Sequence, residues 1–194
     1  MVREVTDERD ALLAFLAEQR AAVRRAAHGL TDVQAAATPS ASDLSVGALV
    51  KHLVLVEDTW MRLLRGEVHE LLDEPTFGME PGDTLDGLLA DYDAAARRTE
   101  ETVSGLSDLG RPVDITAMSP LLPAGTSRSA RWVLFHLVEE TARHAGHADV
   151  IRESLDGSSA LDLVSATGAP LMPEYPELTV DSVRSGTVDR SRGE

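Results

Sequence analysis

The sequence predicts an all-α protein built on an up-and-down four-helix bundle with an irregular C-terminal tail. Four segments repeat apolar residues at the three- and four-residue spacing of an amphipathic helix, and the intervals between them are rich in glycine, proline, serine and aspartate. The chain has 194 residues, which is enough for one domain with a sizeable core. We therefore expect a bundle domain over residues 1–157 and a strap over residues 158–194.

The first two predicted helices have clear boundary signals. The first covers about residues 7–28, with acidic residues at its positive end and Gly29 as its stop. The second covers about residues 45–65 and is closed by Gly66. The residues expected to face inward are Leu12, Phe15, Leu16 and Val23 in the first helix and Leu49, His52, Leu53, Val56, Trp60 and Leu63 in the second.

The second half of the chain alternates helices with irregular segments. A connection over residues 67–82 is expected to hold at most one turn of helix, and a third helix follows over about residues 84–106. Residues 110–129 contain three prolines and are predicted to form a long loop, which in a compact domain is often functional. The fourth helix covers about residues 129–156. Residues 158–194 lack strong periodicity, so we expect them to become disordered toward their end.

Composition excludes several classes of partner and site. The formal net charge is -15 and the sequence pI is near 4.7, which argues against binding to nucleic acid or to anionic membranes. Cysteine is absent, so any metal site must use histidine, aspartate or glutamate. The N-terminus lacks the apolar run of a signal peptide and no segment is long enough to span a bilayer, so a cytoplasmic location is expected. Lys51 is the only lysine and asparagine is absent, a bias associated with G+C-rich genomes.

The fourth helix carries four metal-capable side chains at intervals of four, four and three residues. Because each residue turns a helix by about 100°, all four fall within roughly a quarter of its circumference. Glu140 and His144 interrupt the apolar stripe of this helix. An unpaired charge buried there is too costly to persist, so these side chains must pair with polar groups or hold a metal ion. The four residues are His136, Glu140, His144 and His147.

His52 lies in the middle of the apolar stripe of the second helix. A lone histidine on such a face is most often a core residue, but sites in bundles form where side chains from facing helices converge. His52, Glu140 and His144 together can supply three ligands to one divalent ion. Three protein ligands leave open positions, which is the arrangement of catalytic rather than structural sites.

The other two histidines of the fourth helix lie at the edge of the stripe. His136 and His147 are either half-exposed polar residues or additional ligands, neighbours of a ligand, or groups that transfer protons. Of these, His147 is the candidate for proton transfer. Trp60, at the inward edge of the second helix, is predicted to be a core residue rather than a platform for substrate.

Two segments resemble a known superfamily. They are residues 47–60, GALVKHLVLVEDTW, and residues 131–149, RWVLFHLVEETARHAGHAD. They are similar to the DinB-like superfamily, and within it to the actinobacterial branch of mycothiol-dependent enzymes, over about residues 7–157. The resemblance implies a four-helix bundle that holds a divalent metal, zinc or nickel, through His52, Glu140 and His144. It also implies a homodimer.

Two departures qualify the resemblance. Many superfamily members have histidine where this chain has Glu140, whereas the mycothiol-dependent maleylpyruvate isomerase branch has glutamate there. The usual glutamine three residues after the last ligand is here His147, so the role of that position is expected to differ. The isomerase also has a second, C-terminal domain that residues 158–194 are too short to supply, so isomerisation of maleylpyruvate is not the expected activity.

The leading functional hypothesis is a metal-dependent S-transferase. A divalent metal with an open position would bind a low-molecular-weight thiol such as mycothiol, lower the pKa of the thiol and present it to an electrophilic substrate. His147 would assist proton transfer, and residues 110–129 would cover the substrate. One alternative is a metal-dependent hydrolase with Glu140 or His147 as base, which is less favoured if Glu140 is a ligand. The other is a non-catalytic metal-binding or stress-related module.

Overall fold

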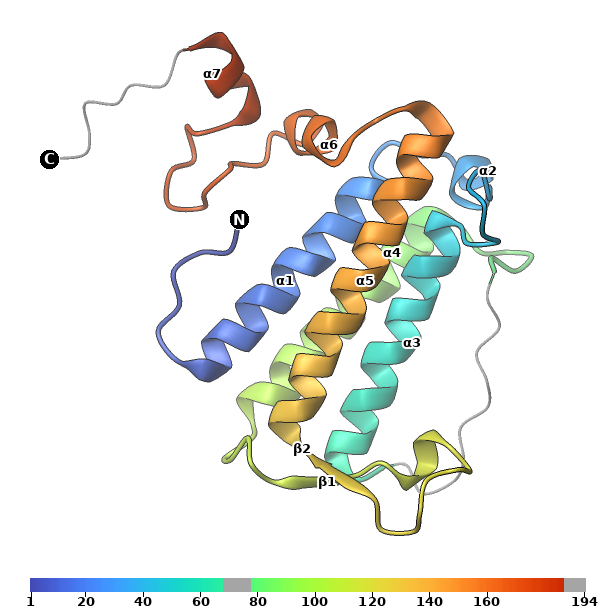
Figure 1. Ribbon diagram of the computed structural model, residues 1–194, viewed down its shortest axis with the longest axis vertical. Coiled ribbons are helices and arrows are strands. Elements are labelled where there is room, and N and C mark those ends of the chain that lie inside the picture. The colour runs from blue at the N-terminus through green and yellow to red at the C-terminus, as the bar shows by residue number, and fades with distance from the viewer. Residues whose placement is uncertain (68–77, 187–194) are drawn as a thin grey trace, which may run out of the picture.

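The computed structural model describes residues 1–67 and 78–186 and confirms the all-α prediction (Figure 1). Each of the four predicted helices is present within a few residues of its expected bounds. Two short strands and several short helices join them. The elements are α1 Glu8–Ala27, α2 Asp32–Ala35, α3 Val46–Arg65, α4 Leu85–Ser104, β1 Pro112–Asp114, a 3-10 turn Thr116–Met118, β2 Ser127–Ser129, α5 Ala130–Asp156, α6 Ala160–Ala166 and α7 Val180–Ser185.

The directions of the four long helices differ from simple alternation. α1 and α5 begin at the same end of the bundle, where Glu8 accepts hydrogen bonds from Arg131. α3 and α4 both begin at the other end, where Lys51 donates to Asp83 at 2.9 Å. The long helices therefore run up, down, down and up in chain order, and α5 lies between α1 and α3 (Figure 1).

Several short elements were not indicated by the sequence pattern. α2 is a single turn closed by a capping box between Thr31 and Gln34. Within the predicted loop of residues 110–129, β1 and β2 form an antiparallel hairpin in which Val113 pairs with Arg128. The tail is largely irregular, as predicted, but it contains α6 and α7. The disorder expected at the end of the tail and most of the connection over residues 67–82 lie outside the described residues.

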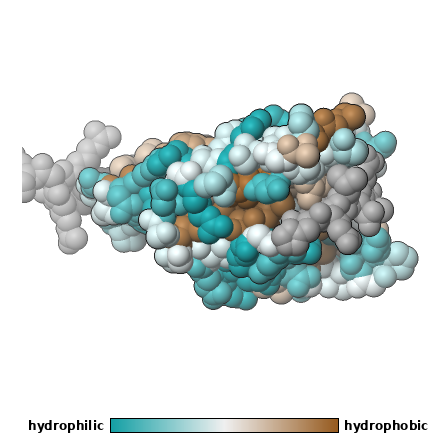
Figure 2. All heavy atoms as spheres, turned by 90° about the horizontal axis from the view of Figure 1, so that it is seen from below, coloured by the Kyte–Doolittle hydropathy of each residue, from teal (hydrophilic) through white to brown (hydrophobic). Residues whose placement is uncertain are grey.

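The core follows the predicted stripes with one exception. Leu12, Leu16 and Val23 of α1 are buried, but Phe15 is 47% exposed and the prediction that it faces inward was wrong. Phe15 lines a hollow between α1 and α5 together with Phe135 of α5, which is also exposed. Seen from below, the molecule exposes an apolar area next to hydrophilic residues (Figure 2). Within the part of the chain that the structure describes, no helix is both long and apolar enough to cross a membrane.

The start of α5 depends on one side-chain cap. Ser129 has extended backbone, and its hydroxyl accepts a hydrogen bond from the amide of Trp132 at 3.1 Å. This bond satisfies one of the amides that a helix start leaves without a partner. Ser129→Ala is therefore expected to lower the free energy of unfolding by about 1 kcal/mol in urea denaturation. Ser129→Asp can form the same cap and should retain most of the stability, so an equal loss in both variants would contradict this role.

Candidate metal site

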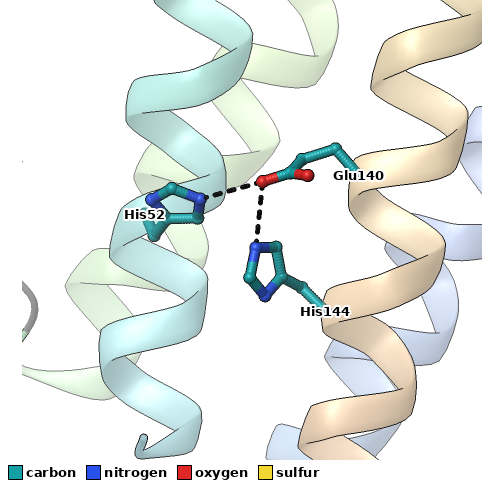
Figure 3. Close-up of side chains that lie close together, drawn as sticks. All are labelled: His52, Glu140 and His144. Carbon is teal, nitrogen blue, oxygen red and sulfur yellow. Dashed lines mark hydrogen bonds and ion pairs between the residues drawn. The ribbon is translucent and has the colours of Figure 1, made fainter.

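The predicted ligands converge on one point between two antiparallel helices. His52 projects from the middle of α3, and Glu140 and His144 project from successive turns of α5 (Figure 3). α3 is a regular helix between its Ser45 cap and Gly66, which ends it in the left-handed conformation. The four-residue spacing on α5 aligns Glu140 and His144 on the face toward α3. The three side chains thus point toward one another, as the sequence predicted.

The geometry of the three side chains is close. Oε1 of Glu140 lies 3.0 Å from Nε2 of His144 and 3.3 Å from Nε2 of His52. The rings of His52 and His144 meet edge to face, with centroids 4.8 Å apart. One ligand atom from each residue can be chosen so that all of them lie within 4.8 Å of one another. One carboxylate oxygen therefore lies between two imidazole nitrogens.

This donor set fits a divalent metal ion. Bonds of about 2.0–2.2 Å from zinc to nitrogen or oxygen place neighbouring ligand atoms roughly 3 to 3.5 Å apart. The separations of 3.0 and 3.3 Å around Glu140 fall in this range. Two imidazoles and one carboxylate also suit zinc, nickel or iron better than calcium or magnesium. Three side chains leave room for further ligands, and they are largely buried, with side-chain exposed fractions of 11–17%.

The ionisation of Glu140 and His144 is compatible with binding of a metal ion. Burial raises the pKa of the Glu140 carboxyl, but its contacts with His52 and His144 outweigh this effect and hold the pKa below its usual value. Burial lowers the pKa of the His144 imidazole, and the neighbouring Glu140 opposes this only in part. Ionised glutamate and neutral histidine are therefore favoured near neutral pH. These are the protonation states in which the two side chains bind metals.

His147 lies beside the three side chains rather than among them. Its side chain is on the exposed edge of α5, and its Nδ1 is 3.4 Å from Nδ1 of His144. Nε2 of His144 faces Glu140, so the contact with His147 engages the other ring nitrogen. Metal-bound histidines usually donate their second N–H to a hydrogen-bond acceptor, which fixes the ring orientation, and Nδ1 of His147 is the atom within reach here. The sequence left several roles open for His147. This contact favours one of them, that of a neighbour of a metal ligand.

His136 belongs to a different cluster. Its ring stacks on Trp132 at 5.3 Å with an interplanar angle of 12°, and it meets Trp60 edge to face at 5.1 Å. Trp60 is only 4% exposed, which confirms that it is a core residue. Trp132 lies one turn before His136 on the same helix, but it was not among the residues that the sequence pattern indicated as functional. We call Trp60, Trp132 and His136 the aromatic shelf.

A surface groove among the described residues includes one of the candidate ligands in its lining. This groove of about 310 Å³ lies between α3 and α4, and the ligand is His52. Its other polar residues are mainly acidic, and Asp83 and Asp58 already pair with Lys51 and Arg98. A second hollow of about 230 Å³ between α1 and α5 is lined mostly by apolar side chains and includes none of the three candidate ligands.

Comparison with known proteins agrees with this architecture. A model of the mycothiol-S-transferase family matches residues 11–157. The chain belongs to the mycothiol-S-transferase family. The matched residues of this mycothiol-S-transferase family member include all four long helices except the first residues of α1, and they include His52, Glu140 and His144.

The solved structures add a likeness of fold. A crystal structure of a conserved protein from Enterococcus faecalis matches with a TM-score of 0.58 and 16% sequence identity. The match covers 79% of this chain and 100% of that one. At this identity the similarity shows the fold alone. No functionally curated protein matches the sequence.

Proposed function

We propose that this protein is a metal-dependent S-transferase that joins a low-molecular-weight thiol, mycothiol, to an electrophilic small molecule. The observation that carries the proposal is the meeting of His52, Glu140 and His144 at one point in a member of the mycothiol-S-transferase family. A bundle core that needed only packing would not direct three such side chains at one another. Zinc or nickel is the ion that we expect there.

In this proposal, three residues bind the metal ion and a fourth orients one of them. His52, Glu140 and His144 hold the ion, and His147 orients the ring of His144 through their Nδ1 contact. A bound divalent metal supplies one chemical effect, which is to lower the pKa of a thiol at neutral pH. The sulfur then forms a bond to an electrophilic carbon. The thiol proton leaves to solvent, and either a leaving group departs with its electron pair or the adduct takes up a proton.

The protein itself offers no competing nucleophile of the same kind. It contains no cysteine, so the sulfur must come from a separate thiol. Hydrolysis is less well supported, because Oε1 of Glu140 contacts the ring nitrogens of both His52 and His144. A carboxylate held in this way is placed as a ligand rather than as a free base.

The proposal is tested by a thiol-transfer assay. Protein loaded with zinc or nickel is incubated with mycothiol and a panel of electrophiles, and the adduct with a new carbon–sulfur bond is measured by mass spectrometry. We expect catalysed formation of the adduct, and we expect His144→Ala to reduce the rate to that of the uncatalysed reaction, because it removes one ligand.

A matched control is His28→Ala. His28 is an exposed histidine at the end of α1, so this variant also loses one imidazole but leaves the site intact and should keep the wild-type rate. Absence of catalysed adducts across the panel in metal-loaded protein would overturn the transferase. So would an undiminished rate in His144→Ala.

A further inference from the structure

The aromatic shelf lies along the same helix–helix contact as the candidate metal site. His136 is one turn before Glu140 on α5, a separation of about 6 Å along the helix axis. Trp132 is about 12 Å from Glu140 by the same measure, and Trp60 is equally far from His52 on α3. Since α3 and α5 are antiparallel, these intervals run in the same direction. The shelf therefore begins one turn from the proposed metal ligands.

The shelf presents a fixed flat surface. Trp132 is 41% exposed, whereas Trp60 behind it is 4% exposed. The two indole rings meet at 5.8 Å, and His136 stacks nearly parallel to Trp132. These contacts hold the exposed indole in one orientation. A ring held in this way can stack against a second planar group without losing conformational freedom.

A positive charge lies over this surface. The guanidinium of Arg128, presented by β2, is 5.6 Å from the centre of the Trp132 ring. Its Nη1 donates to the carbonyl of Ser127 at 2.9 Å, and within residues 1–67 and 78–186 it forms no ion pair with a carboxylate. Acidic residues outnumber basic residues by 33 to 18 in this chain. An arginine that pairs with none of the described carboxylates is available to bind an anion.

The Glu139 carboxylate, which contacts His136 of the shelf, already has a positively charged partner. Oε2 of Glu139 is 3.4 Å from Nδ1 of His136, and its other oxygen accepts a hydrogen bond from Arg143 at 2.6 Å. The charge of Glu139 is therefore neutralised from the side of α5 that faces solvent. The cationic character of the shelf comes from Arg128.

We propose that the aromatic shelf and Arg128 form the subsite for the electrophile, and that they select planar conjugated molecules that carry a carboxylate. The planar part stacks on Trp132 where Arg128 now lies, the guanidinium turns aside to pair with the carboxylate, and the remainder extends toward Glu140. That this ligand is the electrophile of the transfer reaction rests on the proposed function. Binding itself requires neither metal nor thiol, so the two can fail separately.

The tryptophans provide a direct assay. The chain has two tryptophans, and both belong to the shelf, so intrinsic tryptophan fluorescence reports on this site alone. The probes are 4-nitrobenzoate and its neutral analogue 4-nitrobenzamide, which quench indole on contact, added to protein without metal or thiol. We expect half-maximal quenching by the anion at a concentration about tenfold lower than by the amide, the value of one charge-assisted contact.

Two arginine variants separate this subsite from general attraction of anions. Arg128→Gln is expected to abolish the preference for 4-nitrobenzoate, and circular dichroism should be unchanged because the side chain is exposed. Arg97→Gln removes an exposed arginine of α4 and should keep the preference. Equal quenching by the two probes in the wild type would overturn the proposal, as would a preference that survives Arg128→Gln.

The transfer assay tests the link to the reaction. With an anionic aromatic electrophile, Arg128→Gln should raise KM about tenfold while kcat changes little, because the lost contact is remote from the reacting carbon. An unchanged KM would show that the shelf does not bind the electrophile. If the quenching results hold and no electrophile is transferred, the subsite stands and the proposed function fails.

Discussion

Replacement of His144 by alanine is expected to abolish stoichiometric binding of a divalent metal. Wild-type protein incubated with zinc or nickel should hold one ion per chain after gel filtration. The variant should hold almost none, because Glu140 and His52 alone provide two ligands. His144 is buried and adjoins core residues of α5, so circular dichroism should accompany elemental analysis to show that the helices remain.

A graded series gives this prediction its control. His147→Ala should keep one ion per chain but weaken its affinity by about 10- to 100-fold in competition with a chelator, because it removes the partner of the His144 ring. His28→Ala should change neither quantity. If wild-type protein takes up no stoichiometric metal, or if His144→Ala retains it, these three side chains do not form a metal site.

Glu57→Gln is expected to lower the free energy of unfolding by about 3–5 kcal/mol. Glu57 is fully buried in α3 and binds the buried guanidinium of Arg20 through two hydrogen bonds, of 2.8 and 2.5 Å. Thr99 of α4 donates to the same carboxylate at 2.8 Å. Loss of the negative charge would leave the buried Arg20 with only a longer contact, of 3.4 Å, to the half-exposed carboxylate of Glu100. Urea denaturation of wild type and variant measures the difference.

Two comparisons distinguish this effect from a general sensitivity to charge. Asp58→Asn breaks a partly exposed pair with Arg98 and should change the stability by less than about 1 kcal/mol. The double variant Arg20→Met with Glu57→Leu should recover much of the loss, because well-packed apolar residues can replace a buried ion pair. A loss below about 1 kcal/mol in Glu57→Gln would contradict a structural role for this pair.

The buried pair also illustrates a limit of the sequence pattern. Arg20 and Glu57 each occupy the apolar stripe of their helix, four residues after Leu16 and Leu53. A charged residue at such a position is predicted to be buried, but the sequence does not indicate which residue it pairs with. The two residues are 37 positions apart, and only the packing of α1 against α3 brings them together.

The sequence alone determined the four long helices and the shared face of Glu140 and His144. These are consequences of local periodicity, because a spacing of four residues aligns side chains whatever the helix packs against. That His52 lies near Glu140 and His144 was a prediction from the apolar stripes of two helices. The tertiary structure brings the three side chains together, because α3 packs antiparallel to α5 in a register that places His52 at the level of Glu140 and His144. No feature within either helix specifies that register.

Other properties were decided only by tertiary structure. α3 and α4 begin at the same end of the bundle and are parallel, and helical periodicity has no direction that would reveal this. Phe15 lies on a predicted apolar stripe yet is 47% exposed, because the neighbouring helices cover only part of α1. Arg128 lies over Trp132 because of a three-residue strand pairing with β1. The sequence thus determined which side chains share a helix face, and packing between helices decided which faces meet.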